Sequence, residues 1–418
     1  MESYHITGGN KLEGEYYLKG AKNAVLPILA ATIISGSTSI IKNCPDLTDV
    51  QTMIEILKEM GCKVAREGDT ILVDSSTIDT FTIPRHLMKE IRSSVFLMGP
   101  TLARCGKVIL SNPGGCAIGQ RPIDIHISAL KRLGVEIEEK EGILECKVNR
   151  LVGGRIPLDF PSVGATENVM MAAVMAEGET QILNAAKEPE IVDLQNFLRS
   201  CGAEIYGAGT KEIHVVGKKQ LGKTTYKVIP DRIEGGTILA AVAATGGKIL
   251  LKNSIPFHMS SIIDKLIEAG CKVKKGDDFV SLKAPERLTG INPVETLPYP
   301  GFPTDLQSQL VTLMSISEGT TYVKETIFEN RFKYIEELKK MGANIKVDGT
   351  AAIVTGVERL KGNRVIAKDL RGGASLVIAG LVAEGNTIVE NICHIDRGYD
   401  KFEIALSKLG ADIKRVKV

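Results

Sequence analysis

A cysteine surrounded by glycines is the residue of this chain best suited to do chemistry. Cys116 lies in the segment Asn112–Pro122, whose glycines let the backbone bend freely. Arg121 follows five residues later, close enough to favour the thiolate and able to hold a phosphate or carboxylate oxygen. A thiol beside an anion-binding group suits acid or nucleophilic catalysis, although the segment could also be a surface turn with an incidental cysteine.

Three more segments place polar groups where helices are expected to begin. Lys22 and Asn23 precede an apolar stretch, so a cation and an amide lie at a helix N-terminus, which suits a phosphate or is ordinary capping. The segment Ser162–Thr166 also opens a helix and could offer backbone N–H groups to an anion. Asp305 opens a further apolar helix, either as a capping acid or as a carboxylate base presented at the helix end.

Four arginines recur just before expected helices. They are Arg232, Arg331, Arg371 and Arg397. Each could be an exposed ion-pair partner, the usual state of a charged residue. Their repetition at equivalent helix starts favours instead a shared cationic surface in a central cleft.

Composition argues against several other classes of function. The net charge of +2 gives no reason to expect nucleic acid or an anionic membrane as a partner. No G-x-G-x-x-G follows a strand and no Walker A lysine pattern occurs, which disfavours a nicotinamide or ATP site. Residues 1–10 lack a signal-peptide stretch and no apolar run approaches the ~18 residues that span a bilayer, so we expect a cytoplasmic protein without membrane insertion. The length of 418 residues predicts two or three domains.

An internal repeat supplies the elements that must position these residues. Six glycines recur 68 to 73 residues apart, each after an amphipathic stretch and before a strand-like segment: Gly61, Gly134, Gly202, Gly270, Gly342 and Gly410. Glycine directly after a helix is the expected left-handed cap. Turn-then-strand segments lie upstream, at 178–184, 246–253, 319–325 and 385–391. Apolar helices such as Ile238–Ala244 precede them, so we expect these helices to be buried and the strands to form sheets around them.

The second repeat is longer than the others at the cysteine segment. From the strand end to the helix-end glycine it takes 22 residues (112–134), against 18 in the first repeat (43–61). A packed repeat does not need this insertion, so a functional loop is favoured. Other cysteines lie at helix-to-strand positions that favour small buried residues, namely Cys62, Cys201 and Cys271. No CxxC or His/Cys cluster occurs, so we expect neither a disulfide framework nor a metal site.

Over essentially its whole length the chain resembles the bacterial UDP-N-acetylglucosamine 1-carboxyvinyltransferase family of enolpyruvyl transferases. The matching segments are Gly20–Ala24, Pro113–Cys116, Gly119–Pro122, Ser162–Thr166, Lys187–Asp193, Pro230–Glu234, Phe302–Asp305, Phe328–Phe332 and His394–Tyr399. The resemblance implies an α/β fold, a two-domain inside-out α/β barrel built from six βαβαββ repeats, three per domain. It implies a first domain of residues 22–229 that carries the Cys116 loop, and a second of residues 1–21 plus 230–418 that carries Asp305, Arg331, Arg371 and Arg397. The active site is expected in the cleft between them.

The reaction implied by the resemblance is transfer of the enolpyruvyl group of phosphoenolpyruvate to the 3′-hydroxyl of UDP-N-acetylglucosamine. It proceeds by addition and elimination with release of phosphate, and it is the first committed step of peptidoglycan synthesis. Cys116 would be the general acid, the residue that forms a covalent adduct with phosphoenolpyruvate and the target of fosfomycin. Asp305 would be the base at the sugar hydroxyl. No cofactor or metal is implied, and we expect a monomer or weak oligomer.

The resemblance also assigns binding roles by position. The catalytic residues would be Cys116, Asp305, Lys22 and Arg397. Phosphoenolpyruvate would be bound by Lys22, Asn23, Arg121 and Arg397. UDP-N-acetylglucosamine would be bound by Asn23, Arg92, Arg121, Pro122, Asp124, Ser162, Val163, Gly164, Asp305 and Ile327. Domain closure and support of the base would involve Arg331, Asp369 and Arg371.

Three alternatives remain at this point. Enolpyruvylshikimate phosphate synthases share the fold and the phosphoenolpyruvate clamp, but the cysteine loop and the nucleotide-sugar motifs argue against them. A non-enzymatic repeat scaffold, such as a ring-shaped clamp, would predict a basic channel, which the near-neutral net charge disfavours. A related protein that has turned to regulation would not need intact Cys116, Asp305 and Lys22.

Overall fold

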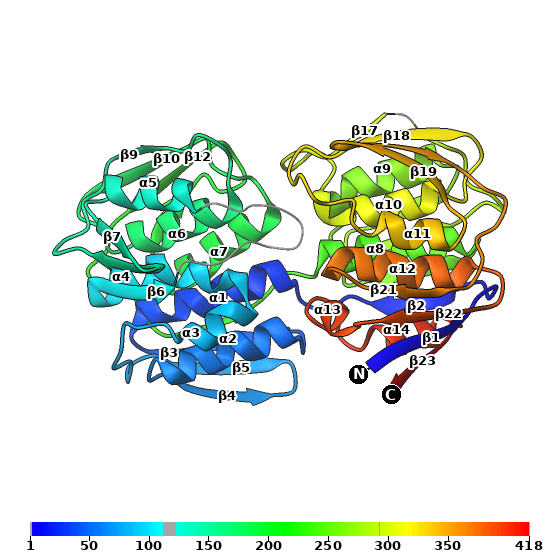
Figure 1. Cartoon of the computed structure of the whole chain (residues 1–418). Helices are drawn as coiled ribbons and strands as arrows, with labels where there is room; N and C mark the ends of the chain where they lie inside the picture. Colours follow the sequence, from blue (N-terminus) through cyan, green and yellow to red (C-terminus); the bar gives the residue numbers. More distant parts are fainter. Residues whose placement is uncertain (1, 112–122, 292, 418) are drawn as a thin grey trace. The chain divides into compact units, whose positions relative to one another are not determined.

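The computed structural model describes residues 2–111, 123–291 and 293–417 (Figure 1). The expected site residues Cys116, Arg121 and Pro122 lie outside the described residues. The described residues divide into two compact units. We call residues 20–111 and 123–229 the first unit, and residues 2–19 and 230–417 the second unit.

The first unit alternates helices and strands along the chain. Its helices are α1 (Lys22–Ser35), α2 (Thr48–Glu59), α3 (Arg85–Glu90), the 3₁₀ helix η1 (Arg92–Leu97), α4 (Met98–Cys105), α5 (Asp124–Arg132), α6 (Val163–Ala173) and α7 (Pro189–Ser200). Its strands are β3 (Thr38–Lys42), β4 (Lys63–Glu67), β5 (Thr70–Asp74), β6 (Lys107–Ser111), β7 (Glu136–Lys140), β8 (Ile143–Lys147), β9 (Arg155–Pro157), β10 (Glu179–Leu183), β11 (Glu204–Tyr206), β12 (Glu212–Val216) and β13 (Thr224–Lys227).

The second unit repeats this alternation and adds the two N-terminal strands. Its helices are α8 (Arg232–Ala244), η2 (Pro256–Met259), α9 (Ser260–Glu268), η3 (Thr304–Leu306), α10 (Gln307–Met314), α11 (Ile335–Lys340), α12 (Leu370–Val382), α13 (Cys393–Asp396) and α14 (Phe402–Lys408). Its strands are β1 (Glu2–Thr7), β2 (Glu13–Tyr17), β14 (Lys248–Lys252), β15 (Lys272–Lys275), β16 (Phe279–Lys283), β17 (Val294–Glu295), β18 (Thr320–Lys324), β19 (Asn344–Asp348), β20 (Ala351–Thr355), β21 (Arg364–Ile366), β22 (Asn386–Glu390) and β23 (Asp412–Lys417).

Within the described part of the chain the strands form six small sheets, three in each unit. Five of them have four strands, in orders such as β9-β10-β12-β11 and β17-β18-β20-β19. In both of these examples the first two strands are parallel and the remaining pairings are antiparallel. The sheet β6-β8-β7 has three named strands and a further parallel bridge between Thr82 and Ile109. The predicted α/β fold of six repeats, three per unit, is confirmed.

Two sheets take their first strand from a distant part of the sequence. Strand β13 lies parallel to β3, with Tyr226 opposite Ile41 in the first unit. Strand β2 lies parallel to β14, with Tyr16 opposite Leu251 in the second unit. Strand β13 thus joins a sheet whose other strands end at residue 74, and β2 belongs to a sheet whose other strands begin at residue 248. Both separations follow from the passage of the chain between units at residues 19–20 and 229–230.

The N-terminal strand completes the last repeat. Strand β1 lies between β22 and β23 and is antiparallel to both, with Ile6 opposite Thr387 and Ile413. It takes the place that the final hairpin strand holds in the other sheets. The two ends of the chain are thus held together in the second unit, as Figure 1 shows at the labels N and C.

The apolar helices lie inside the units and the sheets lie around them. In Figure 1, α1 and α6 lie in the middle part of the first unit, and α8, α10 and α12 in the middle part of the second. Every residue of α10 is buried, as are all of α8 except its first and last residues. The six glycines predicted to end helices all have positive φ, between 93° and 107°. Both expectations from the repeat are confirmed, and no helix among the described residues is long and apolar enough to cross a bilayer.

Candidate active site

The strongest candidate for a base lies at the start of α10 in the second unit. Asp305, in η3, accepts a hydrogen bond from Arg331 Nη2 at 2.8 Å on Oδ1 and one from Arg371 Nη2 at 3.1 Å on Oδ2. Both guanidinium groups are buried, at 3% and 4% side-chain exposure, whereas the Asp305 side chain is 26% exposed. Charge-assisted bonds to both oxygens fix the plane of the carboxylate while leaving part of it accessible. Arg331 and Arg371 are therefore not the exposed ion-pair partners that one sequence interpretation allowed.

Local structure explains why these arginines are held in place. Asp369 caps α12, because its Oδ1 accepts from the backbone amides of Arg371 and Gly372 at 3.0 Å each. Arg331 also donates through Nε and Nη2 to the carbonyl oxygen of Thr304, at 3.3 and 3.1 Å. Arg331 thus binds the Thr304–Asp305 segment through a backbone carbonyl as well as through the carboxylate.

Arg397 follows α13 in the sixth repeat and is half-buried. Burial and then the positive charge of Arg397 lower the pKa of His394, which indicates that the imidazole and the guanidinium are close. The preceding residue, Asp396, accepts hydrogen bonds from Arg415 of β23 on both oxygens. Arg415 also donates to Glu2 at 2.7 Å and to the Tyr4 hydroxyl at 2.9 Å, so the two terminal strands together brace the segment that carries Arg397.

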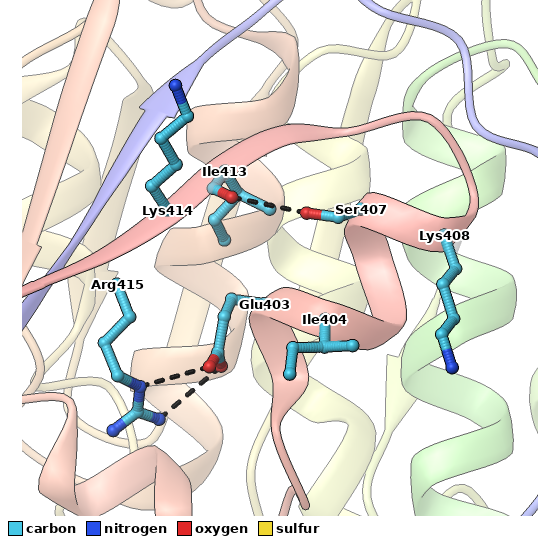
Figure 2. A pocket seen from close by; sticks show the side chains of 7 residues that line it. All are labelled: Glu403, Ile404, Ser407, Lys408, Ile413, Lys414 and Arg415. Carbon is cyan, nitrogen blue, oxygen red and sulfur yellow. Dashed lines mark hydrogen bonds and ion pairs between the residues drawn. The ribbon is translucent and has the colours of Figure 1, made fainter.

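A hollow of about 600 Å³ adjoins this brace but contains none of the predicted site residues. Figure 2 shows Glu403 pointing toward Arg415, whose Nε donates to it at 3.2 Å. The hollow is lined by Glu403, Ile404, Ser407, Lys408, Ile413, Lys414 and Arg415. Its mixed charges and its position at α14 and β23 set it apart from Asp305 and Arg397.

In the first unit, Lys22 is the first residue of α1 and is buried beside a carboxylate. Its Nζ lies 2.7 Å from Asp49 Oδ2, and the two side chains are 9% and 4% exposed. Asp49 lies in the first turn of α2, so two adjacent helix starts supply the ion pair. Asn23 follows on α1 and is half-buried. The expected cation and amide at a helix N-terminus are present, with an acidic partner that the sequence motif did not reveal.

The predicted nucleotide-sugar segment at residues 162–164 begins α6. Ser162 caps the helix by accepting from the amide of Ala165 at 3.3 Å, and Val163 and Gly164 are half-buried. A Cβ on Gly164 would lie 3.0 Å from the ring of His126, so glycine permits the close approach of α5. Asp124 opens α5 and is exposed.

A buried asparagine ties this segment to the rest of the unit. Asn168 Oδ1 accepts from the amide of Gly99 at 2.7 Å, and its Nδ2 donates to the Val95 carbonyl at 3.0 Å. Nδ2 also lies 2.9 Å from His126 Nδ1. Asn168 thereby ties α6 to α4, η1 and α5. Arg92 begins η1, and its side chain is outside the described part of the structure, like those of Cys116, Arg121 and Pro122.

The repeat cysteines contrast with a reactive thiol. Cys62, Cys201 and Cys271 are buried and unpaired with other cysteines, and burial raises the pKa of each to about 12. Such thiols stay protonated and inert at neutral pH, so the prediction that these cysteines serve packing is confirmed. Among the described residues no group of three or more His, Cys, Asp or Glu is arranged to hold a metal ion.

Each passage of the chain between units is bordered by a buried acid. Asp193 accepts from the Tyr226 hydroxyl at 2.5 Å and from the Ile229 amide at 3.3 Å, and burial raises its pKa to about 7 despite these bonds. Glu234 accepts from the Lys19 amide at 3.4 Å, and burial raises its pKa to about 7 as well. Sequence reasoning quoted the motifs containing both acids but gave them no role.

Four supporting residues escaped sequence reasoning. They are Asp49, His126, Asn168 and Glu325. A polar residue within an apolar helix is the one signal that could have pointed to Asn168, because a buried amide needs partners. For the others the partner is distant in sequence, and no spacing rule reveals it.

The chain is similar over its length to known carboxyvinyl and enolpyruvyl transferases. The family model described as EPSP synthase (3-phosphoshikimate 1-carboxyvinyltransferase) matches residues 6–406. A protein of Caldanaerobacter subterraneus subsp. tengcongensis named UDP-N-acetylglucosamine 1-carboxyvinyltransferase 2 is 54% identical over 416 residues, which cover 100% of each chain. The crystal structure of the enolpyruvyl transferase NikO from Streptomyces tendae matches with a TM-score of 0.89 at 27% identity, covering 100% of this chain and 99% of that one. An EPSP synthase from Acinetobacter baumannii shares the fold at a TM-score of 0.74 and 18% identity, covering 100% of each chain.

Proposed function

We propose that this chain, which belongs to the EPSP synthase family of enolpyruvyl transferases, transfers the enolpyruvyl group of phosphoenolpyruvate to the 3′-hydroxyl of UDP-N-acetylglucosamine. The acceptor is taken from relatives about half identical over the full length, which carry the name UDP-N-acetylglucosamine 1-carboxyvinyltransferase. Shikimate 3-phosphate is the acceptor of the alternative enzyme, whose solved examples share only the fold with this chain. The product would enter peptidoglycan synthesis.

The observation that carries this proposal is the partly exposed Asp305 carboxylate fixed between two buried guanidinium groups. A general base for a sugar hydroxyl needs a fixed orientation, and it must be accessible to solvent so that the substrate can reach it. Asp305 takes the hydroxyl proton as the sugar oxygen bonds to C2 of phosphoenolpyruvate. Arg331, Asp369 and Arg371 support this base. That the same three residues also take part in domain closure stays a prediction.

The second proton transfer is assigned to Cys116. Its thiol delivers a proton to C3 of phosphoenolpyruvate during addition, so a C–H and a C–O bond form as the C=C bond is lost. In elimination a proton passes from C3 back to the Cys116 thiolate, the double bond returns, and phosphate departs from C2 with the proton that Asp305 had taken. The same thiol would form the covalent adduct with phosphoenolpyruvate and react with fosfomycin.

Cations from both units are assigned to the charges of phosphoenolpyruvate. Lys22 and Arg397 are described in their separate units, and Arg121 and Asn23 complete the proposed set. Loss of one such charge-assisted contact should cost on the order of 2–4 kcal/mol in the transition state. The nucleotide sugar is assigned to Asn23, Arg92, Arg121, Pro122, Asp124, Ser162, Val163, Gly164, Asp305 and Ile327.

Phosphate release tests the proposal directly. The protein is given phosphoenolpyruvate with either UDP-N-acetylglucosamine or shikimate 3-phosphate, before and after treatment with fosfomycin. Release only with the nucleotide sugar, abolished by fosfomycin, supports both the acceptor and Cys116. Release with shikimate 3-phosphate would move the chain to the sister activity, and release with neither would refute enolpyruvyl transfer.

The remaining expectations belong to the same proposal. We propose a cytoplasmic enzyme that acts as a monomer or weak oligomer without nucleic acid or cofactor. Sedimentation of the active protein at several concentrations measures the oligomeric state, and a stable tetramer would contradict it.

A further inference from the structure

The residue that follows the second strand of a repeat has the same conformation in four of the six repeats. In four repeats it is an asparagine with positive φ between 51° and 63°: Asn43, Asn184, Asn253 and Asn391. In three of these the side-chain amide donates to the carbonyl opposite it on the first strand's extension, at 2.9, 2.8 and 2.7 Å. The asparagine thus closes the end of the parallel pair. The second repeat has Asn112 there, outside the described residues.

The fifth repeat replaces this asparagine with Glu325, which is buried at 2% exposure. Its Oε1 accepts from Thr296 Oγ1 at 2.8 Å, from the Ile327 amide at 2.8 Å and from the Phe328 amide at 3.2 Å. Its Oε2 accepts from Thr304 Oγ1 at 2.9 Å. Thr296 lies at the position that, in the other repeats, is held by the residue whose carbonyl oxygen accepts from the asparagine, because it follows Glu295, which pairs with Lys324.

Three of these four bonds join two segments of the candidate site. One is Ile327–Phe328, which contains an assigned contact of the nucleotide sugar. The other is Thr304–Asp305, which contains the base. Glu325 bonds to Thr304, which directly precedes the base Asp305, and we call this link the tether. Arg331 donates both to the Thr304 carbonyl and to the Asp305 carboxylate, so it holds the end of the tether nearest the base together with the base itself.

We propose that Glu325 is a positioning residue that couples the nucleotide-sugar segment to the base. This inference rests on the proposed function, since it takes Asp305 as the base and Ile327 as a sugar contact. A carboxylate suits the task because all four partners are donors. A glutamine whose NH₂ group faces Thr304 would reverse that bond and lose the charge-assisted bonds of the carboxylate. In the opposite rotamer its NH₂ group would face the amides of Ile327 and Phe328 and leave them without an acceptor.

The test compares Glu325→Gln with Asn253→Asp, which makes the reverse exchange at the equivalent position of the fourth repeat. For Glu325→Gln we expect kcat to fall about tenfold or more and KM for UDP-N-acetylglucosamine to rise, while KM for phosphoenolpyruvate stays unchanged. Asn253→Asp removes the hydrogen bond of 2.7 Å from the side-chain amide to the Leu18 carbonyl, so the Tm of this variant should fall. Its kcat and its KM values for both substrates should stay at wild-type values. Equal changes in both variants, or wild-type constants in Glu325→Gln, would overturn the inference.

A second variant separates the two arms of the tether. Thr304→Val has nearly the same shape but lacks the hydroxyl that donates to Glu325. It should lower kcat several-fold and leave KM for the nucleotide sugar near the wild-type value, since the bonds to Ile327 and Phe328 persist. An unchanged kcat would show that the bond to Thr304 does not position the base.

Amide hydrogen exchange keeps the inference separate from the proposed function. If wild-type protein releases no phosphate with the nucleotide sugar, the proposed function is wrong. Faster exchange at residues 302–308 and 325–331 in Glu325→Gln, but not in Asn253→Asp, would still support the tether. Unchanged exchange in both segments would overturn it even if the enzyme is active.

Discussion

Glu234 should make the stability of the second unit fall as the pH rises. Its buried carboxyl accepts from the Tyr16 hydroxyl at 2.7 Å and from the Lys19 amide at 3.4 Å. Burial and then the charge of Asp231 raise its pKa from 4.5 to about 7. Between these two values the folded protein keeps a proton that the unfolded chain has released, so the free energy of unfolding decreases with pH across this window.

The size of the effect follows from the two pKa values of Glu234. Their difference corresponds to a loss of about 3 kcal/mol in the free energy of unfolding. This loss is absent below pH 4.5 and complete above pH 7. Glu234→Gln cannot ionise, and its amide oxygen can still accept from Tyr16. The variant should lie within about 1 kcal/mol of wild type at pH 5 and be more stable by about 3 kcal/mol at pH 8.

Urea unfolding at pH 5 and pH 8 measures this difference. Circular dichroism is a suitable probe because the chain has no tryptophan. Glu337→Gln is the matched control: burial raises the pKa of Glu337, but hydrogen bonds from Lys340, Lys368 and the Ile366 amide lower it overall. The ionised Glu337 carboxylate therefore stabilises the folded protein above the pKa that this group has in the unfolded chain, and the stabilisation is lost in acid. Glu337→Gln lacks the carboxylate and should be less stable than wild type at pH 8. An advantage of Glu234→Gln that is equal at both pH values would refute the reasoning.

Three other substitutions test the site and the packing. Asp49→Asn removes the carboxylate 2.7 Å from Lys22 and should raise KM for phosphoenolpyruvate about tenfold or more, whereas an unchanged KM in steady-state kinetics would contradict the role of Lys22. Arg371→Lys loses the planar donor bonded to the base at 3.1 Å and should lower kcat about 10- to 100-fold with little change in that KM; a wild-type kcat would show that the base is aimed without it. Gly99→Ala brings a Cβ within 2.3 Å of a backbone carbonyl of α6 and should lower Tm by about 5 °C in a thermal melt, while Gly154→Ala, with open space around it, should match wild type.

Much of the fold was predictable because its signals are local. The helix-ending glycines need positive φ, and each is marked in the sequence by an amphipathic stretch before it and a strand after it. The same pattern placed Lys22 at the start of α1 and Ser162 at the cap of α6. The extra length of the second repeat singled out the Cys116 segment without any structural knowledge.

The repeat, the helices and strands within it and the types of the reactive side chains can all be read from local patterns of residues. The folded chain was needed to show that β1 completes the last sheet, that β2 pairs with β14 and that Asp305 is held by Arg331 and Arg371. These partners lie from 26 residues apart (Asp305 and Arg331) to 415 residues apart (Glu2 and Lys417) in the chain. Periodicity and capping act over a few residues, whereas strand pairing and buried ion pairs depend on which surfaces meet once the helices are buried.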